Sequence, residues 1–484
     1  MTDLGRAVGL IALGGALWAN ALGHDLVWDD RLLALEPTDP WTMVARRTGA
    51  YYRPVVLASY ALDRALAGGA PLAFHATNVV LHVAVAWLVF RLATAVGLAA
   101  GPAFAGAALF LAHPVQTEAV TYVSGRTDVL GALGALGGLL LWRRARHAAD
   151  RWATAAAAAV LAGLLAKEAV VAVPLVLLLP AAHPGPRRPR PILPIAAALA
   201  WLLAWTASGG PGVRLEGLAA RLPAIAGGAL TLARVLVWPS DLHLERFTAV
   251  PGWTPLAAAG AFAGVAALLA VLGLAARRVP GGALLLALAV LAYLPVSGLV
   301  PVYPAVADRV LFTAEHFLYL PLAGLAPLVA GAVARHLPGR AGVAAAVACV
   351  ASCGAVTVDR NRDWRDEETI FRHTLAYDPP SARVWYDLGN AALAAGRLTE
   401  AVRLYDAAVA REPHDAAAWL NLGIARQRLG DGRAAEAAYR AALAADPHRA
   451  EAYRGLAAVL AARGETGEAL RLLERWRAES GAAR

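Results

Sequence analysis

The chain has 484 residues, of which 59% are hydrophobic and only 16% are charged, and its mean hydropathy is +0.53. Soluble globular proteins carry about 25% charged residues, so this composition excludes an ordinary soluble protein and predicts a polytopic membrane protein. The net charge of +9 comes largely from short loops between apolar runs, which indicates membrane topology rather than binding to nucleic acid.

Apolar runs close to the length of a membrane span recur through the first 358 residues. About 20 apolar residues cross a bilayer as a helix, so each run is a candidate span. The runs cover residues 5–23, 74–96, 101–117, 128–142, 152–181, 191–208, 222–238, 254–276, 281–299, 317–334 and 341–358.

Basic clusters orient these runs, because Lys and Arg are enriched in cytoplasmic loops. All the clusters reach the cytoplasm only if 152–181 breaks at Lys167–Glu168 into two short spans. The run 222–238 must then be re-entrant or lie along the outer surface. This arrangement predicts eleven crossings, with the N-terminus cytoplasmic and the C-terminal part outside. The clusters are residues 143–151, 183–191, 277–278 and 335–340.

Two adjacent carboxylates, Asp29 and Asp30, lie in "HDLVWDDRLL" at the start of the first external loop, residues 24–73. Neighbouring side chains on an extended or turn segment point in different directions, so the two acids are expected to have different roles. We expect one to act as a general base and the other to be held by Arg or a backbone amide. Nearby Trp28 and the membrane favour Asp29 as the base, and Arg31 is expected to keep Asp30 ionised.

Further polar side chains gather at the same predicted outer face. An ionised group near the bilayer centre costs about 2.5–3.5 kcal/mol, so their concentration predicts a wet polar cavity there. Solvated loops and helix-end charges are the alternative interpretation. The set contains Arg53, His75, Asn78, His82, His113, Glu118, Arg126, Asp128, Lys167, Glu168, Asp308, Arg309, Glu315 and His316.

A carboxylate among cations at an outer membrane surface suits a phosphate-bearing donor and a hydroxyl acceptor. The carboxylate accepts the hydroxyl proton, and the cations bind the phosphate as it leaves. These residues therefore predict glycosyl transfer from a polyprenyl-phosphate sugar, with Arg53, Arg126, Lys167 and Arg309 as candidate phosphate ligands.

Two other classes of function remain open. A transporter would place its polar groups near the membrane midplane. A membrane scaffold for envelope assembly would use the C-terminal repeats and would tolerate replacement of Asp29 and Asp30, which an enzyme would not.

Metal and redox chemistry have little support in the sequence. Cys349 and Cys353 are spaced i, i+4 in an apolar run without a neighbouring histidine or acid, which indicates a packed helix face. Asp29 and Asp30 alone are too few ligands for a dedicated cation cage, so no metal site is predicted.

From Asp359 the chain becomes polar and repeats with a period of 34 residues. Trp385, Leu388, Gly389, Ala401, Tyr405, Ala408 and Pro413 recur as Trp419, Leu422, Gly423, Ala435, Tyr439, Ala442 and Pro447. This is the tetratricopeptide pattern, which forms an α-solenoid that binds peptides or proteins in a concave groove. The predicted units are 382–415, 416–449 and 450–483, preceded by a half unit at 363–380.

Several stretches resemble the transmembrane and tetratricopeptide-repeat O-mannosyltransferases. They include "LVWDD", "YRPVVLASYALD", "HATNVVLHVAVAWL", "HPVQTEAVTYVSGRTDVL", "AKEAVVAVPLVLLL" and "AEHFLYLPLAGL", together with the passage into the repeats. The resemblance implies an all-α fold with a GT-C membrane helix bundle at 1–358 and a tetratricopeptide-repeat domain at 359–484. It departs at His316, where the family has Arg, at Gln116, where the family has His, and in the short array.

The resemblance also implies an inverting glycosyltransferase with Asp29 and Asp30 in its catalytic motif. The donor would be a dolichyl- or undecaprenyl-phosphate sugar, commonly mannose, and the acceptor Ser or Thr of a protein bound by the repeats. A lipid- or polysaccharide-directed transferase is an alternative, and some enzymes of this class use a divalent cation such as Mg or Mn. The Ala- and Arg-rich composition favours undecaprenyl phosphate and the outer face of a bacterial inner membrane.

Overall fold

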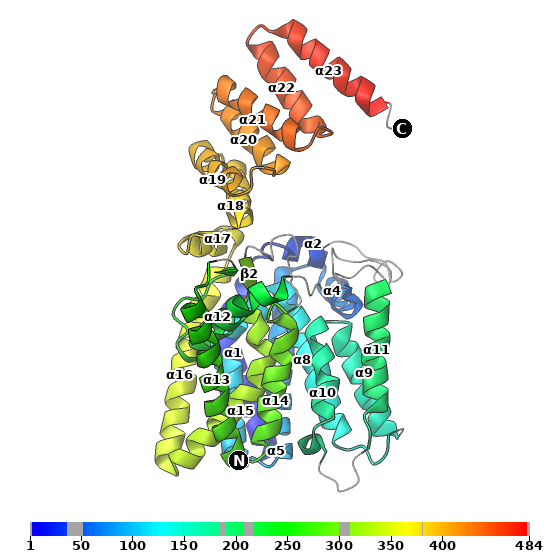
Figure 1. Ribbon diagram of the computed structural model, residues 1–484, viewed down its shortest axis with the longest axis vertical. Coiled ribbons are helices and arrows are strands. Elements are labelled where there is room, and N and C mark those ends of the chain that lie inside the picture. The colour runs from blue at the N-terminus through cyan, green and yellow to red at the C-terminus, as the bar shows by residue number, and fades with distance from the viewer. Residues whose placement is uncertain are drawn as a thin grey trace. The chain divides into compact units, whose positions relative to one another are not determined.

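The computed structural model describes residues 2–35, 52–148, 150–183, 189–207, 217–250, 252–299, 310–379 and 381–481. The chain forms two compact units, Met1–Asp366 and Glu367–Arg484. The first unit is a helix bundle with one two-stranded sheet, and the second consists of helix pairs (Figure 1). The predicted all-α membrane bundle followed by an α-solenoid is confirmed. The predicted boundary after residue 358 falls inside the last helix of the bundle.

Local sequence signals fix the ends of the first helices. The Thr2 hydroxyl accepts from the backbone N–H of Gly5 and caps α1, and Pro54 occupies the first turn of α4. Gly68, at φ +63°, ends α4 in the left-handed conformation. The elements are α1 (Asp3–Trp18), η1 (Ala19–Gly23), α2 (Asp30–Leu35), α4 (Pro54–Ala67), α5 (Pro71–Ala95), α6 (Ala100–Ala112), η2 (Pro114–Gln116), α7 (Thr117–Val120), η3 (Val123–Gly125) and α8 (Arg126–Trp142).

The chain breaks at Lys167–Glu168, where the basic clusters require a reversal. α9 (Arg151–Leu164) ends before this pair, and η4 (Glu168–Ala172), α10 (Val173–Leu177) and η5 (Pro180–Ala182) follow it. Helices α8 and α9 pack backbone to backbone, because a Cβ on Gly134 would lie 2.5 Å from the Cα of Gly163. Close packing of this kind is typical of small residues between membrane helices.

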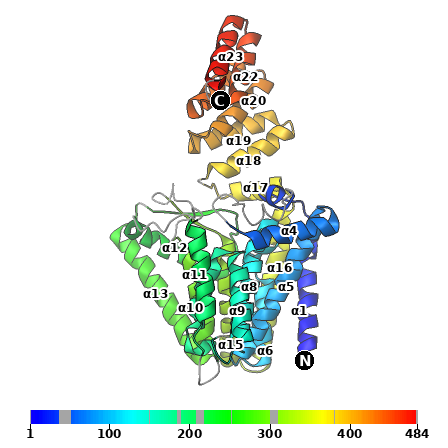
Figure 2. The same cartoon turned by 90° about the vertical axis from the view of Figure 1, so that its right-hand side faces the viewer.

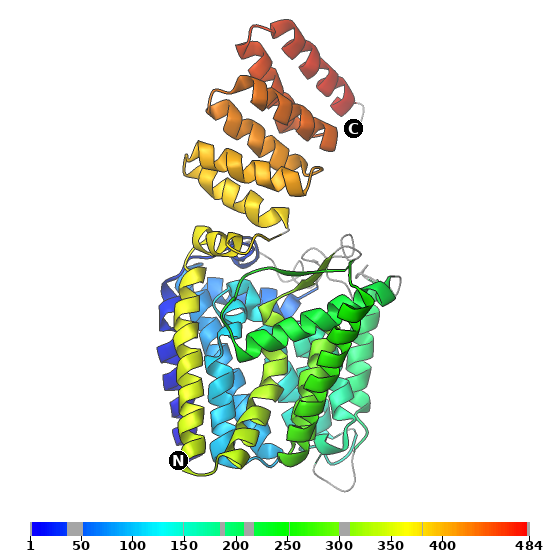
Figure 3. The ribbon, with the colours of Figure 1, turned by 60° about the vertical axis from the view of Figure 1, so that its left-hand side comes forward.

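The second half of the bundle contains the long helix α13 and the two-stranded sheet. β1 pairs antiparallel with β2, with Arg246 opposite Thr313. Helix α12 lies across the bundle near this sheet rather than parallel to its neighbours (Figure 3). The elements are α11 (Ile192–Ala207), α12 (Leu218–Val237), β1 (Arg246–Ala249), α13 (Pro255–Arg278), α14 (Gly282–Tyr293), η6 (Leu294–Val296), β2 (Val310–Thr313), η7 (Glu315–Leu318), α15 (Tyr319–His336), α16 (Arg340–Asn361) and η8 (Arg362–Trp364).

The two ends of the bundle differ in composition. The start of α1 and the turns α8–α9, α13–α14 and α15–α16 lie at one end, and these turns carry the basic residues of 143–148, 277–278 and 335–340 (Figures 1 and 2). α2, α4 and β2 lie at the opposite end, which carries the paired acids (Figure 1). The common end of the basic clusters agrees with the positive-inside argument.

Apolar side chains cover much of the bundle's exterior. Within the described residues, six helices are long and apolar enough to cross a membrane, and five further apolar helices are shorter. Large apolar side chains are exposed along α13 and α16, including Leu256, Val271, Val343 and Val347. A lipid environment accounts for these faces, which water would not favour. The number of crossings, eleven, stays a prediction.

The second unit repeats a helix pair. Gly389 and Gly423 face the rings of Tyr405 and Tyr439, where an added Cβ would lie 2.7 Å from ring atoms. The glycine and tyrosine of the first two repeats therefore let the two helices of each pair cross closely, whereas the third repeat has Ala457 and Leu473 at these positions. After α17 (Glu367–Leu375), the pairs are α18 (Ala382–Ala394) with α19 (Leu398–Arg411), α20 (Ala416–Arg428) with α21 (Gly432–Ala445), and α22 (Ala450–Ala462) with α23 (Thr466–Gly481).

Candidate active site

Asp30 opens α2 and is completely buried. Its Oδ1 accepts hydrogen bonds from the backbone N–H of Ser124 at 2.7 Å and the Ser124 hydroxyl at 2.6 Å. Its Oδ2 accepts from the backbone N–H groups of Val123 at 3.2 Å and Val27 at 3.3 Å. Burial raises the pKa of the Asp30 carboxyl to about 7. The side chain thus ties the turn before α2 to the segment between α6 and α8.

Asp29 has a different environment from Asp30. It is half-buried, and its backbone carbonyl accepts the N–H of Leu33 in the first turn of α2. Trp28, just before it, has a positive φ of 54° and stacks on Tyr122 at 5.9 Å between ring centroids. A bulky residue at positive φ is unusual, so this stacking fixes a strained turn beside the acid pair.

Arg126, at the start of α8, is engaged inside the bundle. Its Nη2 lies 2.6 Å from Asp63 Oδ2, and its Nε donates to Asn78 Oδ1 at 2.6 Å. It also donates to the Ser59 hydroxyl at 3.1 Å, and its guanidinium lies 4.7 Å from the centre of the Tyr60 ring. This network joins α4, α5 and α8 directly below the loop that Asp30 anchors. The predicted phosphate-binding role of Arg126 stays a prediction.

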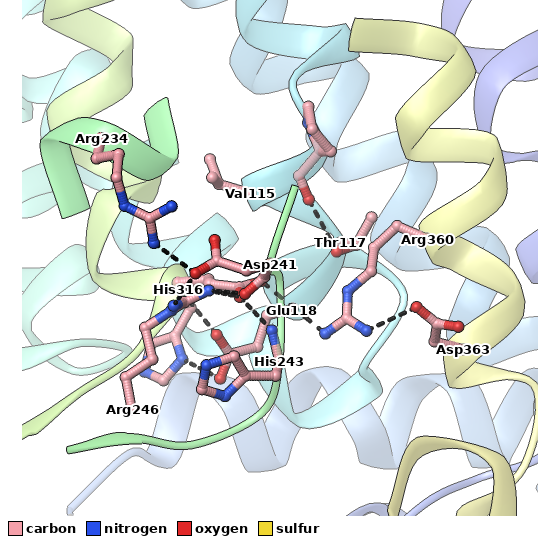
Figure 4. Close-up of polar contacts among 12 residues, drawn as sticks. Val115, Thr117, Glu118, Arg234, Asp241, His243, Arg246, His316, Arg360 and Asp363 are labelled. Atoms are coloured by element: carbon pink, nitrogen blue, oxygen red, sulfur yellow. Dashed lines mark hydrogen bonds and ion pairs between the residues drawn. The ribbon is translucent and has the colours of Figure 1, made fainter. Parts of the chain in front are cut away.

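A second cluster of charges surrounds Glu118 in α7. Its Oε1 lies 2.8 Å from His316 Nδ1, and its Oε2 accepts the backbone N–H of His316 at 3.0 Å. Burial opposes the ionisation of Glu118, but His316 and Arg360 hold its pKa below the ordinary value. Figure 4 shows that these side chains point toward one another from α7, η7 and the end of α16.

Glu315 extends this cluster. Its Oε1 accepts the backbone N–H of His243 at 2.7 Å and lies 3.1 Å from Arg246 Nη2, while Oε2 lies 4.0 Å from Arg360 Nη2. Arg246 also pairs with Asp241 at 3.4 Å (Figure 4). Two buried acids, Glu118 and Glu315, are thus accompanied by two buried arginines from distant parts of the chain, Arg246 and Arg360, as buried charges require.

A third group lies around the break between α9 and α10. Arg53 Nη2 lies 2.9 and 3.0 Å from the two carboxylate oxygens of Glu168. Lys167 Nζ donates to Asp128 Oδ2 at 3.1 Å, and both of these side chains are buried. The structure therefore brings these four residues together as two ion pairs, Arg53–Glu168 and Lys167–Asp128, which are adjacent because Lys167 and Glu168 are consecutive.

The predicted histidines occupy separate places. The ring of buried His75 lies edge-on to His24 at 6.2 Å. His82 is fully buried, with its Nδ1 2.7 Å from the Tyr319 hydroxyl. His113 Nε2 lies 2.9 Å from the carbonyl oxygen of Leu236. Their predicted roles in substrate binding stay predictions.

The segment from His113 to Asp128, hereafter the 113–128 turn, joins these groups. Its η3 end holds Asp30, its α7 holds His316 through Glu118, and its last residue pairs with Lys167. The sequence did not identify Asp63, Ser124, Arg246 or Arg360 as partners, although Asp63 ends the motif "YRPVVLASYALD". Asp308 and Arg309 lie outside the described residues.

A metal site is not evident in the described parts of the chain. Within them, no group of three or more His, Cys, Asp or Glu side chains could hold a metal ion. Cys349 and Cys353 are free thiols on α16. The expectation of a divalent cation therefore stays a prediction.

Comparison with known proteins identifies relatives of both units. A tetratricopeptide-repeat family model matches residues 359–416, 386–426 and 420–483. Protein O-mannosyl-transferase Tmtc1 of Drosophila melanogaster is 32% identical over 188 residues, which cover 35% of this chain and 22% of the fly protein. Protein O-mannosyl-transferase TMTC2 of Mus musculus is 34% identical over 147 residues, which cover 27% of this chain and 18% of the mouse protein.

The matched segments thus span about a fifth of the length of these relatives. Among solved structures, the crystal structure of ArnT from Cupriavidus metallidurans bound to undecaprenyl phosphate aligns with 91% of this chain and 80% of its own. That alignment has 15% identity and a TM-score of 0.45.

The fold and the polar clusters define a multi-helix integral membrane protein that ends in a tetratricopeptide-repeat array. Parts of the chain are similar to transmembrane and tetratricopeptide-repeat O-mannosyl-transferases, which confirms the resemblance found in the sequence.

Proposed function

We propose that the protein is a membrane glycosyltransferase that moves a sugar from a polyprenyl-phosphate donor to a hydroxyl group. The observation that carries this proposal is the unequal environment of the paired acids. Asp30 is buried and accepts four hydrogen bonds, whereas Asp29 is half-buried beside the strained Trp28 turn. Asp30 anchors the loop, and we propose that the half-buried Asp29 meets the substrate.

In the proposed reaction the Asp29 carboxylate accepts the proton of the acceptor hydroxyl. The hydroxyl oxygen forms a bond to the anomeric carbon of the sugar as the bond from that carbon to the donor phosphate breaks. A single displacement of this kind inverts the anomeric configuration and releases the polyprenyl phosphate. General bases contribute typically 10²–10⁴-fold to such rates.

Arg53 is the cation that we propose to bind the donor phosphate. Its side chain is 19% exposed, compared with 0% for Arg126 and 6% for Lys167. Its partner Glu168 is 31% exposed, so a phosphate can reach the pair from solvent. A phosphate in place of the Glu168 carboxylate would keep a charge-assisted hydrogen bond to Arg53 Nη2, the nitrogen that contacts both carboxylate oxygens.

An apolar groove offers a place for the isoprenoid tail of the donor. It has a volume of about 1010 Å³ and lies between α1, α6, α15 and α16. Leu17 and Val358 line its upper end. There, Asn20 donates to the Val358 carbonyl, and Asn361 bonds to both Asn20 and Thr121 of the 113–128 turn. The groove therefore leads from the apolar flank of the bundle toward the end that carries the paired acids.

The sugar and acceptor follow from the relatives, which are named as protein O-mannosyl-transferases. We therefore propose mannose as the sugar and Ser or Thr of a protein as the acceptor, bound by the tetratricopeptide-repeat unit. Undecaprenyl phosphate is the proposed lipid carrier, and the proposed site is the extracytoplasmic face of a bacterial inner membrane.

Labelled donors test this proposal. Membranes containing the protein are supplied with radiolabelled polyprenyl-phosphate mannose, glucose and galactose, and label is followed into protein, lipid and polysaccharide fractions. Transfer of mannose into protein supports the full proposal. Transfer into lipid or polysaccharide overturns the acceptor. No transfer by folded, membrane-inserted protein with any donor favours the scaffold function instead.

A further inference from the structure

A second pocket lies at the end of the bundle opposite the paired acids, between the last turns of α5 and α8. Its volume is about 680 Å³. Leu140, Gly137 and the indole of Trp87 form part of its wall, and Arg91, Arg143 and Arg144 line it as well. The pocket thus combines an apolar wall with three cations.

The contacts of these arginines are with neutral groups. Arg143 donates to the carbonyl oxygens of Ala181 at 2.8 Å and Ala95 at 2.5 Å. The exposed guanidiniums of Arg91 and Arg144 lie 5.7 and 5.2 Å from the rings of Trp87 and Trp152. Asp150, the acid nearest in sequence, is occupied as the N-cap of α9. The pocket therefore retains a net positive charge.

The floor of the pocket is open at one position. A Cβ on Gly137 would meet no atom within 4 Å. The neighbouring glycines of α8 are closely packed. A Cβ on Gly134 would lie 2.5 Å from Gly163, and a Cβ on Gly138 would lie 2.7 Å from Val160. Gly137 thus faces open space next to Leu140 on the pocket wall, six residues before Arg143.

We propose that this pocket binds one anionic glycerophospholipid of the leaflet at the N-terminal end of the bundle. The lipid phosphate would pair with Arg91 and Arg144, and an acyl chain would lie along Gly137 and Leu140. Charge complementarity selects the headgroup, and the apolar wall selects a lipid over a free phosphate. This site is independent of the proposed transferase reaction.

Lipid retention by the full-length protein tests the proposal. Delipidated protein in detergent is mixed with phosphatidylglycerol or phosphatidylcholine of equal chain length, and bound lipid is counted by native mass spectrometry. Two arginines near a membrane surface together contribute about 30-fold to anionic lipid affinity, so Arg91→Gln/Arg144→Gln should weaken phosphatidylglycerol retention by that factor. Gly137→Leu should weaken it about tenfold, the effect of two displaced methylene groups.

Helix α13 provides matched controls. Arg277 and Arg278 are exposed at its C-terminal end. Gly273 lies five residues before Arg278, the last residue of α13, just as Gly137 lies five residues before Trp142, the last residue of α8. A Cβ on Gly273 also meets no atom within 4 Å. Arg277→Gln/Arg278→Gln and Gly273→Leu should therefore leave retention unchanged.

Any of the following results would overturn the proposal. Equal retention of the two lipids, or equal loss in the α13 controls, would show a general surface effect. Displacement by inorganic phosphate alone would show a site for free phosphate. Stronger retention of undecaprenyl phosphate than of phosphatidylglycerol would show a site for the isoprenoid carrier.

Discussion

Replacement of Asp30 by Asn should loosen the loop that leads into α2. The Asn side chain is nearly isosteric, but it exchanges one of two acceptor oxygens for an NH₂ group. The Ser124 contacts at 2.6 and 2.7 Å are the shorter pair, so we expect the NH₂ group to face the N–H groups of Val27 and Val123. Each buried donor that loses its acceptor costs about 1–3 kcal/mol, which gives about 2–6 kcal/mol for the variant.

Amide hydrogen exchange at pH 8 measures this cost, because the carboxylate form of Asp30 prevails above its raised pKa of about 7. If the loop opens locally, a loss of 2 kcal/mol predicts about 30-fold faster exchange at Val27, Val123 and Ser124. Asp29→Asn is the control and should leave these amides protected. Unchanged protection in Asp30→Asn would refute the anchoring role of Asp30.

Three further predictions concern other parts of the first unit. Arg126→Met leaves the buried Asp63 without its cation, with only the Thr77 hydroxyl, among the described residues, as a donor, and should destabilise the protein by about 3–5 kcal/mol, while Arg126→Met/Asp63→Asn should recover part of that loss in thermal unfolding in detergent. Because the pKa of Glu118 is lower in the folded protein than its ordinary value of 4.5, its contribution to stability should be present above pH 4.5 and lost as the pH falls further. Glu118→Gln should remove that acid-dependent loss, and an unchanged pH profile would contradict the pairing with His316. Ala351→Trp, in the apolar groove, should raise the apparent KM for a long-chain donor and spare a short-chain donor, whereas equal effects on both would contradict the tail site.

Much of the fold follows from local signals in the sequence. The 34-residue period places the repeats, and in the first two units one glycine packs against one tyrosine of the partner helix. The break at Lys167–Glu168 follows from the basic clusters on either side of it. The same clusters predict that 222–238 does not cross the membrane. Helix α12, which contains most of this run, lies across the bundle (Figure 3).

The partners within the site are harder to predict, because they come from distant parts of the chain. Arg31, adjacent to Asp30, was expected to keep that acid ionised, but the Arg31 Nε donates to the Leu26 carbonyl and Ser124 contacts Asp30 instead. Arg126 pairs with Asp63, which is 63 residues away, and its complete burial has no local signature. Arg360 meets Glu315 only because α16 returns to the end that carries the paired acids.

Sugar transfer by Asp29→Asn tests the central claim most directly. Wild type, Asp29→Asn and the exposed loop control Asp25→Asn are compared with the same labelled donor, after amide exchange has shown that the loop is intact. We predict a fall in kcat of about 10²–10⁴-fold in Asp29→Asn, because the hydroxyl proton loses its acceptor, and a normal rate in Asp25→Asn. Near-normal transfer by Asp29→Asn would contradict the assignment of Asp29 as the general base.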